Sequence, residues 1–247
     1  LGGALPRCVD VLEALVGRGD GSATRTQAAL ENLTQAAESS PRLFRPELGR
    51  VLHALCGLAR SSLPRECRTG AVELLLTLAE GAPKMCSKLG PPGYACALLE
   101  ALLPMMLRLP EDGADWEEGE PHDGLAQGDD DDEAEAEAAY ALEGLDRLCG
   151  ALDGDLVGPL LLERLAALLG TPGGASWQAT HVALVAVAVV SEHCQAVLTP
   201  HVPSLAGSIA TNARAASPRM RWAAFYSLAV LSDEFGELAE THHQLLL

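Results

Sequence analysis

Small and apolar residues recur at helical spacing in four segments, which begin at Arg25, Arg68, Thr180 and Arg221. An alanine stands three positions after each of these residues, and the intervals between the four alanines are 43, 112 and 41 residues. The intervals fit one period near 42 residues if about 26 extra residues interrupt the third repeat. The pattern therefore predicts five repeats, each made of two helices that bury their apolar sides against neighbours.

A period of about 40–47 residues is typical of the helix pairs of HEAT and armadillo repeats. We therefore expect an all-α fold, a HEAT-repeat α-solenoid of antiparallel helix pairs, over residues 1–247; a helical bundle is the alternative. The expected repeats cover residues 1–42, 43–83, 84–153, 154–197 and 198–240, with an acidic insertion at 110–132 in the third. The expected helix pairs are 5–16 with 23–38, 46–60 with 64–80, 94–109 with 133–151, 155–169 with 177–193, and 200–213 with 218–235.

Local signals mark several helix ends. Ser217 followed by Pro218 is typical of a helix start, because serine caps the first turn and proline fits its first position. Gly81 and Gly236 are expected to end helices. Residues 182–190 are nine consecutive apolar residues rich in valine, which favours a strand on propensity alone. We expect a helix there, since the segment occupies a second-helix position and no other strand is predicted to pair with it.

The charge is concentrated in one segment. The chain has a formal net charge of −17, and residues 111–137 contain 14 Asp or Glu and no Lys or Arg. The rest of the chain is close to neutral, with 20 acidic against 17 basic residues. Direct nucleic-acid binding is disfavoured because it needs a basic face, and basic partners are favoured instead.

The sequence gives little support for a secreted, membrane-spanning, disulfide-bonded or zinc-binding protein. The chain begins at Leu1 and ends in an apolar run, so we expect it to be part of a longer protein, without a signal peptide at its start. An apolar run of nine residues is too short to cross a membrane, which takes about 20. The seven cysteines include no CxxC pair, which disfavours disulfides and a zinc site and suits a reducing compartment.

The sequence offers no catalytic pattern. The seven histidines form no HExxH motif, and glycine-rich phosphate loops and GxSxG are absent. His-Glu dipeptides, which ligate metal in some HEAT-like iron hydroxylases, are also absent; Glu192-His193 has the reverse order. We therefore expect a binding protein that is not an enzyme, with no metal and no cofactor.

Five segments carry a specific pattern: LENLTQAAESSPRLFRPEL at 30–48, AEGAPKM at 79–85, LDRL at 145–148, GDLVGP at 154–159 and SPRMRWAA at 217–224. These segments resemble nuclear transport receptors of the importin-beta (karyopherin-beta) family. The later segments are most similar to the branch called importin five or karyopherin beta three. The match runs in order over nearly the whole chain. One departure is Thr180, which stands where the family usually has Arg or Lys near the start of a second helix.

The resemblance implies a central part of a receptor that shuttles between cytoplasm and nucleus. Such receptors bind import signals of cargo proteins on the concave face formed by the second helices. They release cargo to the GTP-bound form of Ran and contact Phe-Gly repeats of nuclear pore proteins. An alternative is a HEAT-repeat scaffold, such as a phosphatase or microtubule regulator, that does not respond to Ran.

The acidic insertion is the sharpest candidate for partner binding, and the resemblance places an acidic loop in a middle repeat. On composition alone, a solvated loop that aids solubility is the better interpretation. Its position in the family favours contact with basic cargo or with Ran. The candidate residues are Asp115, Trp116, Glu117, Glu118, Asp129, Asp130, Asp131 and Asp132.

A second set of candidates lies on the expected second helices. Carboxylates there would pair with Lys or Arg of a signal, and tryptophans would stack on the same side chains. For any one residue an ordinary solvated helix face is the simpler interpretation, and both tryptophans are alternatively packing residues. The candidates are Glu31, Gln35, Glu38, Glu73, Glu80, Trp177, Glu192, Trp222, Asp233 and Glu234.

Overall fold

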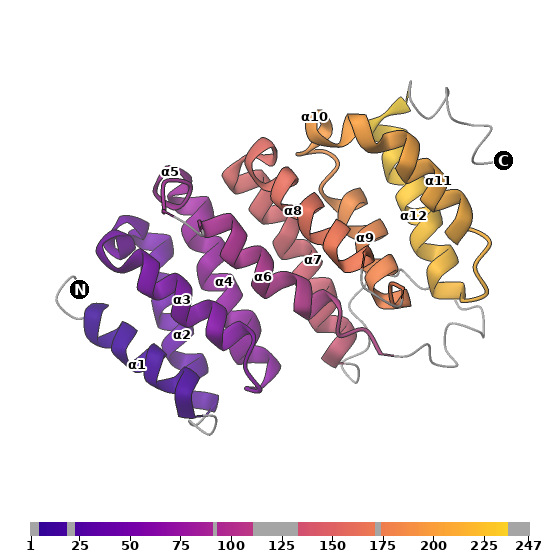
Figure 1. The fold of residues 1–247 in the computed structure, drawn as a ribbon. Coiled ribbons are helices and arrows are strands. Elements are labelled where there is room, and N and C mark those ends of the chain that lie inside the picture. Colours follow the sequence, from indigo (N-terminus) through magenta and orange to yellow (C-terminus); the bar gives the residue numbers. More distant parts are fainter. Residues whose placement is uncertain (1–4, 19–22, 91–92, 111–132, 171–173, 237–247) are drawn as a thin grey trace. The chain divides into compact units, whose positions relative to one another are not determined.

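The computed structural model describes residues 5–18, 23–90, 93–110, 133–170 and 174–236. Within these ranges the secondary structure is entirely helical (Figure 1), in agreement with the all-α prediction. The chain divides into two compact units. Unit 1 comprises residues 1–105 and 150–152, and unit 2 comprises residues 106–149 and 153–247. Each unit is described by itself below.

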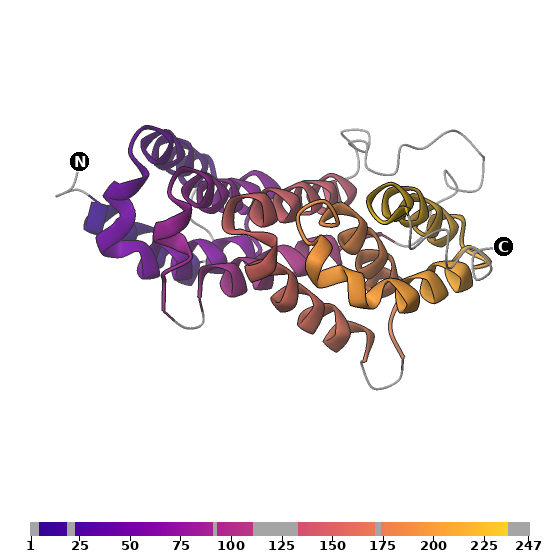
Figure 2. The ribbon, with the colours of Figure 1, turned by 90° about the horizontal axis from the view of Figure 1, so that it is seen from above.

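Unit 1 consists of two layers of helices. Its elements are α1 (Leu5–Arg18), α2 (Ala23–Ser39), the 3-10 helix η1 (Pro41–Glu47), α3 (Leu48–Ala59), α4 (Arg65–Gly81), the short α5 (Pro83–Cys86) and nearly all of α6 (Tyr94–Met106). Helix α1 packs beside α3 and α2 packs beside α4, while α3 also packs against α4. Figure 2 shows α1 and α3 in one layer and α2 and α4 in the other. The predicted pairing of a first with a second helix is therefore observed for α3 and α4.

The core of unit 1 lies between these layers. Leu74, Leu75 and Leu76 of α4 are fully buried, because α2 and α3 both pack on that helix. The buried Tyr94 donates a hydrogen bond of 2.7 Å from its hydroxyl to the Leu75 carbonyl oxygen. Burial also raises the pKa of Tyr94, so its hydroxyl remains protonated and continues to donate. This contact fixes the start of α6 against α4.

Unit 2 repeats the arrangement. Its elements are α7 (Glu133–Leu152, with the last three residues grouped with unit 1), α8 (Gly154–Leu169), α9 (Trp177–Val189), the short α10 (Gln195–Leu198), the 3-10 turn η3 (Thr199–His201), α11 (Val202–Asn212) and α12 (Pro218–Glu234). Helix α8 packs on α9, α11 packs on α12, and the second helices α9 and α12 pack closely on each other. Figure 2 shows α11 and α12 in separate layers.

The apolar run at residues 182–190 forms most of α9, as predicted from its context. Residues 182–188 are all buried, and the Ser227 hydroxyl of α12 donates a hydrogen bond to the Leu184 carbonyl oxygen at 3.0 Å. The valines therefore form the buried surface of a helix that other helices cover on several sides. Tertiary packing has overridden their preference for strands.

The helix starts follow local chemistry. Ser217 and Ser176 cap α12 and α9, and their hydroxyl oxygens accept hydrogen bonds from the Met220 and Ala179 backbone amides at 3.3 and 3.1 Å. The cap at Ser217 confirms the predicted start of α12, and α4 ends at Gly81 as predicted. Two first helices start later than expected, because 3-10 turns that contain proline precede α3 and α11.

Basic residues near the start of second helices anchor the preceding loop. The Arg68 guanidinium donates to the Leu63 carbonyl oxygen, and Arg221 donates to the Ala215 and Ala216 carbonyl oxygens at 3.0 and 2.6 Å. Thr180 stands at the corresponding place in α9, and its hydroxyl bonds within its own helix to the Ser176 carbonyl oxygen at 3.2 Å. The departure noted at Thr180 therefore replaces a loop anchor with a local bond. Among the described helices, none is both long enough and apolar enough to span a membrane.

Candidate functional site

The two ends of the acidic insertion meet in unit 2. Arg108 lies just after α6, and Glu137 lies in the second turn of α7. The Arg108 Nη1 and the Glu137 Oε2 form an ion pair at 3.2 Å, and the Glu137 side chain is only 2% exposed. The described residues on either side of the insertion are therefore joined directly.

A second ion pair joins the start of α7 to α12. The guanidinium of Arg219 contacts the carboxylate of Glu135, and the Arg219 side chain is only 5% exposed. The Arg219 Cζ also lies 5.7 Å from the centroid of the Trp177 ring, which is a cation–π distance. The end of the insertion is thereby connected to the second helices α9 and α12.

Four rings form a row across α9 and α12, and we call Trp177, His181, Trp222 and Tyr226 the aromatic row. Trp177 meets His181 edge to face at 6.4 Å between ring centroids. His181 stacks on Trp222 at 6.1 Å, and Trp222 stacks on Tyr226 at 5.1 Å. The two tryptophans and Tyr226 are half-buried, whereas His181 is buried. The row holds the two second helices together and leaves part of three rings at the surface.

Burial makes His181 a source of pH dependence. Burial, together with the positive charge of Arg219, lowers the pKa of His181 to about 4. The free imidazole titrates near pH 6.5, so the folded protein favours the neutral ring. Its contribution to stability is complete above pH 6.5 and is lost as the pH falls from 6.5 towards 4.

We expect His181 to account for about 3 kcal/mol of stability lost over this pH range, since each pKa unit is worth about 1.4 kcal/mol. The H181Q variant should show a flatter dependence of unfolding free energy on pH between 6.5 and 4. Chemical unfolding at a series of pH values measures this. The H201Q variant, which removes an exposed histidine, is measured beside it for comparison. An unchanged slope in H181Q would refute the assignment.

The predicted second-helix residues lie in both units. In unit 1, Glu31, Gln35, Glu38 and Glu80 are exposed and Glu73 is half-buried. Glu31 accepts a hydrogen bond from the Gln27 amide at 3.0 Å. In unit 2, Glu192 and Asp233 are exposed, and the half-buried Glu234 accepts a hydrogen bond from the Gln195 amide at 2.7 Å. Trp177 and Trp222 come together in the aromatic row, so packing accounts for part of each ring.

The predicted residues of the acidic insertion lie outside the described part of the chain. They are Asp115, Trp116, Glu117, Glu118, Asp129, Asp130, Asp131 and Asp132. The structure instead identifies residues at its borders that sequence reasoning missed, namely Arg108, Glu135, Glu137 and Arg219. In the sequence, Glu135 and Glu137 belong to a run of acidic residues and do not stand out from their neighbours. Only their ion pairs with Arg219 and Arg108 distinguish them.

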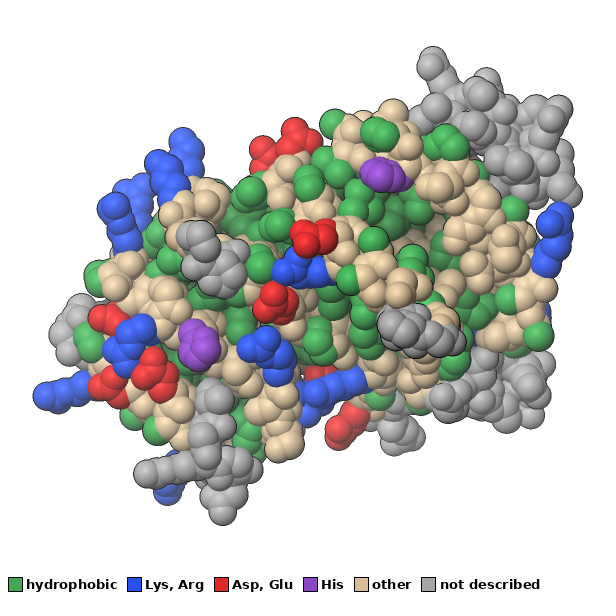
Figure 3. All heavy atoms as spheres, in the orientation of Figure 1, with side chains coloured by type: hydrophobic (Ala, Val, Ile, Leu, Met, Phe, Trp, Pro, Cys, Tyr) green, Lys and Arg blue, Asp and Glu red, His purple; other side chains and the backbone are tan. Residues whose placement is uncertain are grey.

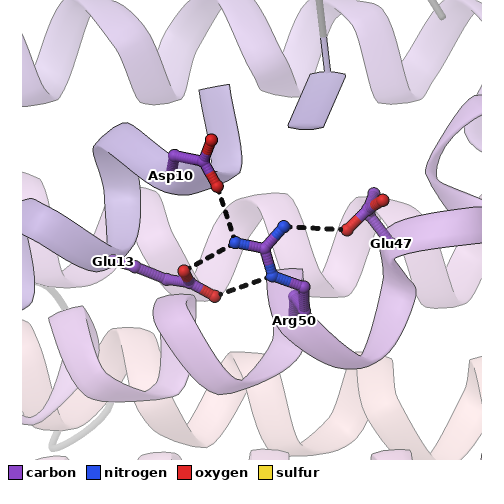
Figure 4. Close-up of polar contacts among 4 residues, drawn as sticks. All are labelled: Asp10, Glu13, Glu47 and Arg50. Carbon is purple, nitrogen blue, oxygen red and sulfur yellow. Dashed lines mark hydrogen bonds and ion pairs between the residues drawn. The ribbon is translucent and has the colours of Figure 1, made fainter. Parts of the chain in front are cut away.

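Unit 1 carries a different charged cluster, on its first helices. Arg50 of α3 contacts Asp10 and Glu13 of α1 at 2.7 Å and Glu47 at 3.2 Å (Figure 4). The hydrogen bonds that Arg50 donates to these carboxylates, above all to Glu13, raise the pKa of Arg50. The cluster is exposed and ties α1 to α3, and exposed pairs contribute little to stability.

The described residues contain no group of His, Cys, Asp or Glu side chains that could hold a metal ion. All seven cysteines are free thiols. Burial raises the pKa of Cys56 and Cys86 to about 12, which makes them poor nucleophiles at neutral pH.

Comparison with known proteins identifies the class. Residues 60–159 match the importin repeat family. The chain is 25% identical to importin subunit beta-3 of Saccharomyces cerevisiae over 249 residues, which is 99% of this chain and 21% of that protein. Among solved structures, the chain is similar to the karyopherin Kap121p bound to the extreme C-terminus of the protein phosphatase Cdc14p. The TM-score is 0.81 and the sequence identity is 25%, and the match covers 99% of this chain and 23% of the Kap121p chain. Kap121p bound to RanGTP matches with a TM-score of 0.79, 23% identity and coverage of 97% and 23%.

Stacked helix pairs of this kind define a HEAT-repeat α-solenoid, the architecture shared with these karyopherins. The chain is similar to members of the importin-beta family, and it spans about a fifth of the length of the curated relative. Its relatives are transport receptors and not enzymes.

Proposed function

We propose that the protein acts as a nuclear import receptor, carrying cargo from cytoplasm to nucleus under control of Ran. The relative Kap121p has been solved with RanGTP, with Nup53p, and with Pho4p and Ste12p. These partners belong to Kap121p. The similarity to these karyopherins supports the same kinds of partner here, and binding of nuclear pore Phe-Gly repeats stays a prediction.

The observation that supports the proposal for this chain is the set of contacts among the residues that flank the acidic insertion. Arg108 and Glu137 join its two ends, and Glu135 contacts Arg219, which lies over Trp177. Glu135, in the described part of the acidic run at 111–137, therefore lies on a path of contacts that leads to half-exposed rings. Carboxylates attract the cations of an import signal, and rings pack against the aliphatic parts of its side chains.

The mechanism we propose is binding and release. A basic, mostly extended signal lies along the second-helix face, with its Lys and Arg side chains near the acidic insertion and carboxylates such as Glu192 and Asp233. The GTP-bound form of Ran presents competing basic surface and displaces the signal. No step requires a covalent intermediate, a metal or a cofactor.

We expect a fluorescently labelled Lys-rich import-signal peptide to bind the 247-residue chain more tightly than a peptide of the same composition in scrambled order. Replacing Asp129, Asp130, Asp131 and Asp132 by Asn should weaken binding of the true signal about tenfold, because each exposed ion pair contributes about 0.2–1 kcal/mol. Fluorescence anisotropy at fixed ionic strength measures both effects.

A matched control removes the same charge elsewhere, by changing the exposed Glu66, Glu143 and Glu163 to Gln and Asp155 to Asn. This variant should bind almost as well as the wild type. Ran loaded with a non-hydrolysable GTP analogue should release the peptide from the full-length receptor. Equal binding of the true and scrambled peptides would make the insertion a non-specific electrostatic trap and remove this support for the proposal.

A further inference from the structure

Two turns in unit 1 share a pattern with exposed positive charge. Pro41 and Arg42 begin η1 after α2, and Pro83 and Lys84 begin α5 after α4. Phe44 and Cys86 stand two positions after Arg42 and Lys84, and their side chains are only 1% and 0% exposed. These buried side chains attach the turns to the core. The buried anchors fix both turns, so each basic side chain is presented by well-packed backbone.

The two turns are neighbours. Helices α2 and α4 pack together, and η1 and α5 both contact α4. A Cβ atom added at Gly81, two residues before Pro83, would lie 3.0 Å from the Pro41 Cγ. The end of α4 therefore touches the start of η1, and the two turns lie on one edge of unit 1.

Four exposed cations occupy this edge, and we call Arg42, Arg45, Lys84 and Lys88 the basic edge. Figure 3 shows Lys and Arg side chains gathered beside α5, without acidic side chains among them on the face drawn. Nearby carboxylates are Glu38 and Glu80, in the last turns of α2 and α4, and Glu47, which contacts Arg50 at 3.2 Å. The edge therefore has a positive balance on a chain whose net charge is −17.

We propose that the basic edge is a docking surface for an extended, Asp/Glu-rich segment of a partner protein. Packed helices lie about 8–10 Å apart, and an extended chain advances about 3.3 Å per residue. Acidic residues three positions apart in the partner thus match the separation of the two turns. This surface is separate from the second-helix face proposed for basic signals, so each proposal can fail without the other.

The edge suits an acidic peptide better than nucleic acid. Single-stranded nucleic acid binds through aromatic rings that stack on bases as well as through cations. Phe44 is the aromatic residue of η1, and it is buried and unavailable for stacking. The remaining recognition is ionic, which suits carboxylates spaced along a flexible chain.

The chain offers a direct test, because Lys84 and Lys88 are its only two lysines. A carbodiimide joins a carboxylate to a nearby lysine amine as an amide, so a bound acidic peptide should become attached to these two residues. The probe is a lysine-free peptide with Asp or Glu at every third position. Its comparison is a peptide of equal composition with all acidic residues at one end. Mass spectrometry of the cross-linked 247-residue chain locates the attachment.

We expect cross-links at Lys84 or Lys88 that are at least about threefold stronger with the spaced peptide and that disappear at high salt, as screening requires. The R42E and R45E double variant retains both lysines and should lose most of the cross-link. The control double variant, R7E and R65E, changes the same charge at other positions of unit 1 and should behave like the wild type. Circular dichroism checks that both variants fold.

Three outcomes would overturn the proposal. One is cross-linking that does not depend on the spacing of the acidic residues, and another is an equal loss in the two double variants. The third is full competition by an oligothymidine of equal charge, which would assign the edge to nucleic acid.

Discussion

Replacing Gly154 by Ala should destabilise unit 2 more than most single substitutions. A Cβ atom there would lie 1.8 Å from the His193 carbonyl oxygen and 2.5 Å from its carbonyl carbon. Both atoms belong to the backbone, so relief requires the first turn of α8 to move away from the turn that follows α9. We expect a loss of about 3 kcal/mol, at the upper end for overpacked sites, or roughly 6–12 °C in Tm.

Thermal unfolding followed by circular dichroism measures this effect, and Gly49 provides the matched control. A Cβ atom at Gly49 in α3 meets nothing within 4 Å. The G49A variant should therefore be neutral or more stable by up to about 1 kcal/mol, because alanine favours helix more than glycine does. If G154A unfolded at the same temperature as G49A, the close approach at His193 would be wrong.

Removing the Arg219 side chain should have an effect of similar size. Arg219 is buried, contacts the Glu135 carboxylate and lies over the Trp177 ring. Truncation leaves a carboxylate without this partner and a space beside the ring, and breaking a buried pair typically costs about 3–5 kcal/mol. We expect R219A to lower the free energy of unfolding by about 3 kcal/mol, measured by urea titration.

A second readout separates local from general damage in this variant. Tryptophan fluorescence should change in R219A, because Trp177 loses the cation at 5.7 Å from its ring. The R214A variant removes an exposed arginine five positions before Arg219, and it should leave stability and fluorescence unchanged. Wild-type stability in R219A would show that the pair with Glu135 contributes nothing.

Much of the helical framework could be predicted from the sequence. The period of the small residues indicated helix pairs, and Ser217 and Gly81 marked helix ends because their chemistry acts locally. The valine run at 182–190 needed context, since propensity alone favoured a strand. The 3-10 turns before α3 and α11 were missed, because the fixed φ of proline suits both the first turn of an α-helix and a 3-10 turn.

The candidate site was less predictable for a physical reason. The pairs Arg108 with Glu137 and Arg219 with Glu135 join residues that are 29 and 84 positions apart. No periodic pattern encodes such contacts, since each pair depends on how helices from different repeats pack. The tryptophans were recognised as candidates, but their mutual stacking through His181 and Tyr226 appears only in three dimensions.

The ion pair between Arg108 and Glu137 has a consequence for how this protein tolerates change. Arg108 and Glu137, which flank the segment at 111–132, pair at 3.2 Å, so the chain on either side of the segment is held together by contacts outside it. Doubling a flexible loop adds only about 0.6 kcal/mol of closure entropy. The position therefore suits insertions, deletions and grafted peptides, and an epitope or a fluorescent label placed there should leave the helix stack intact.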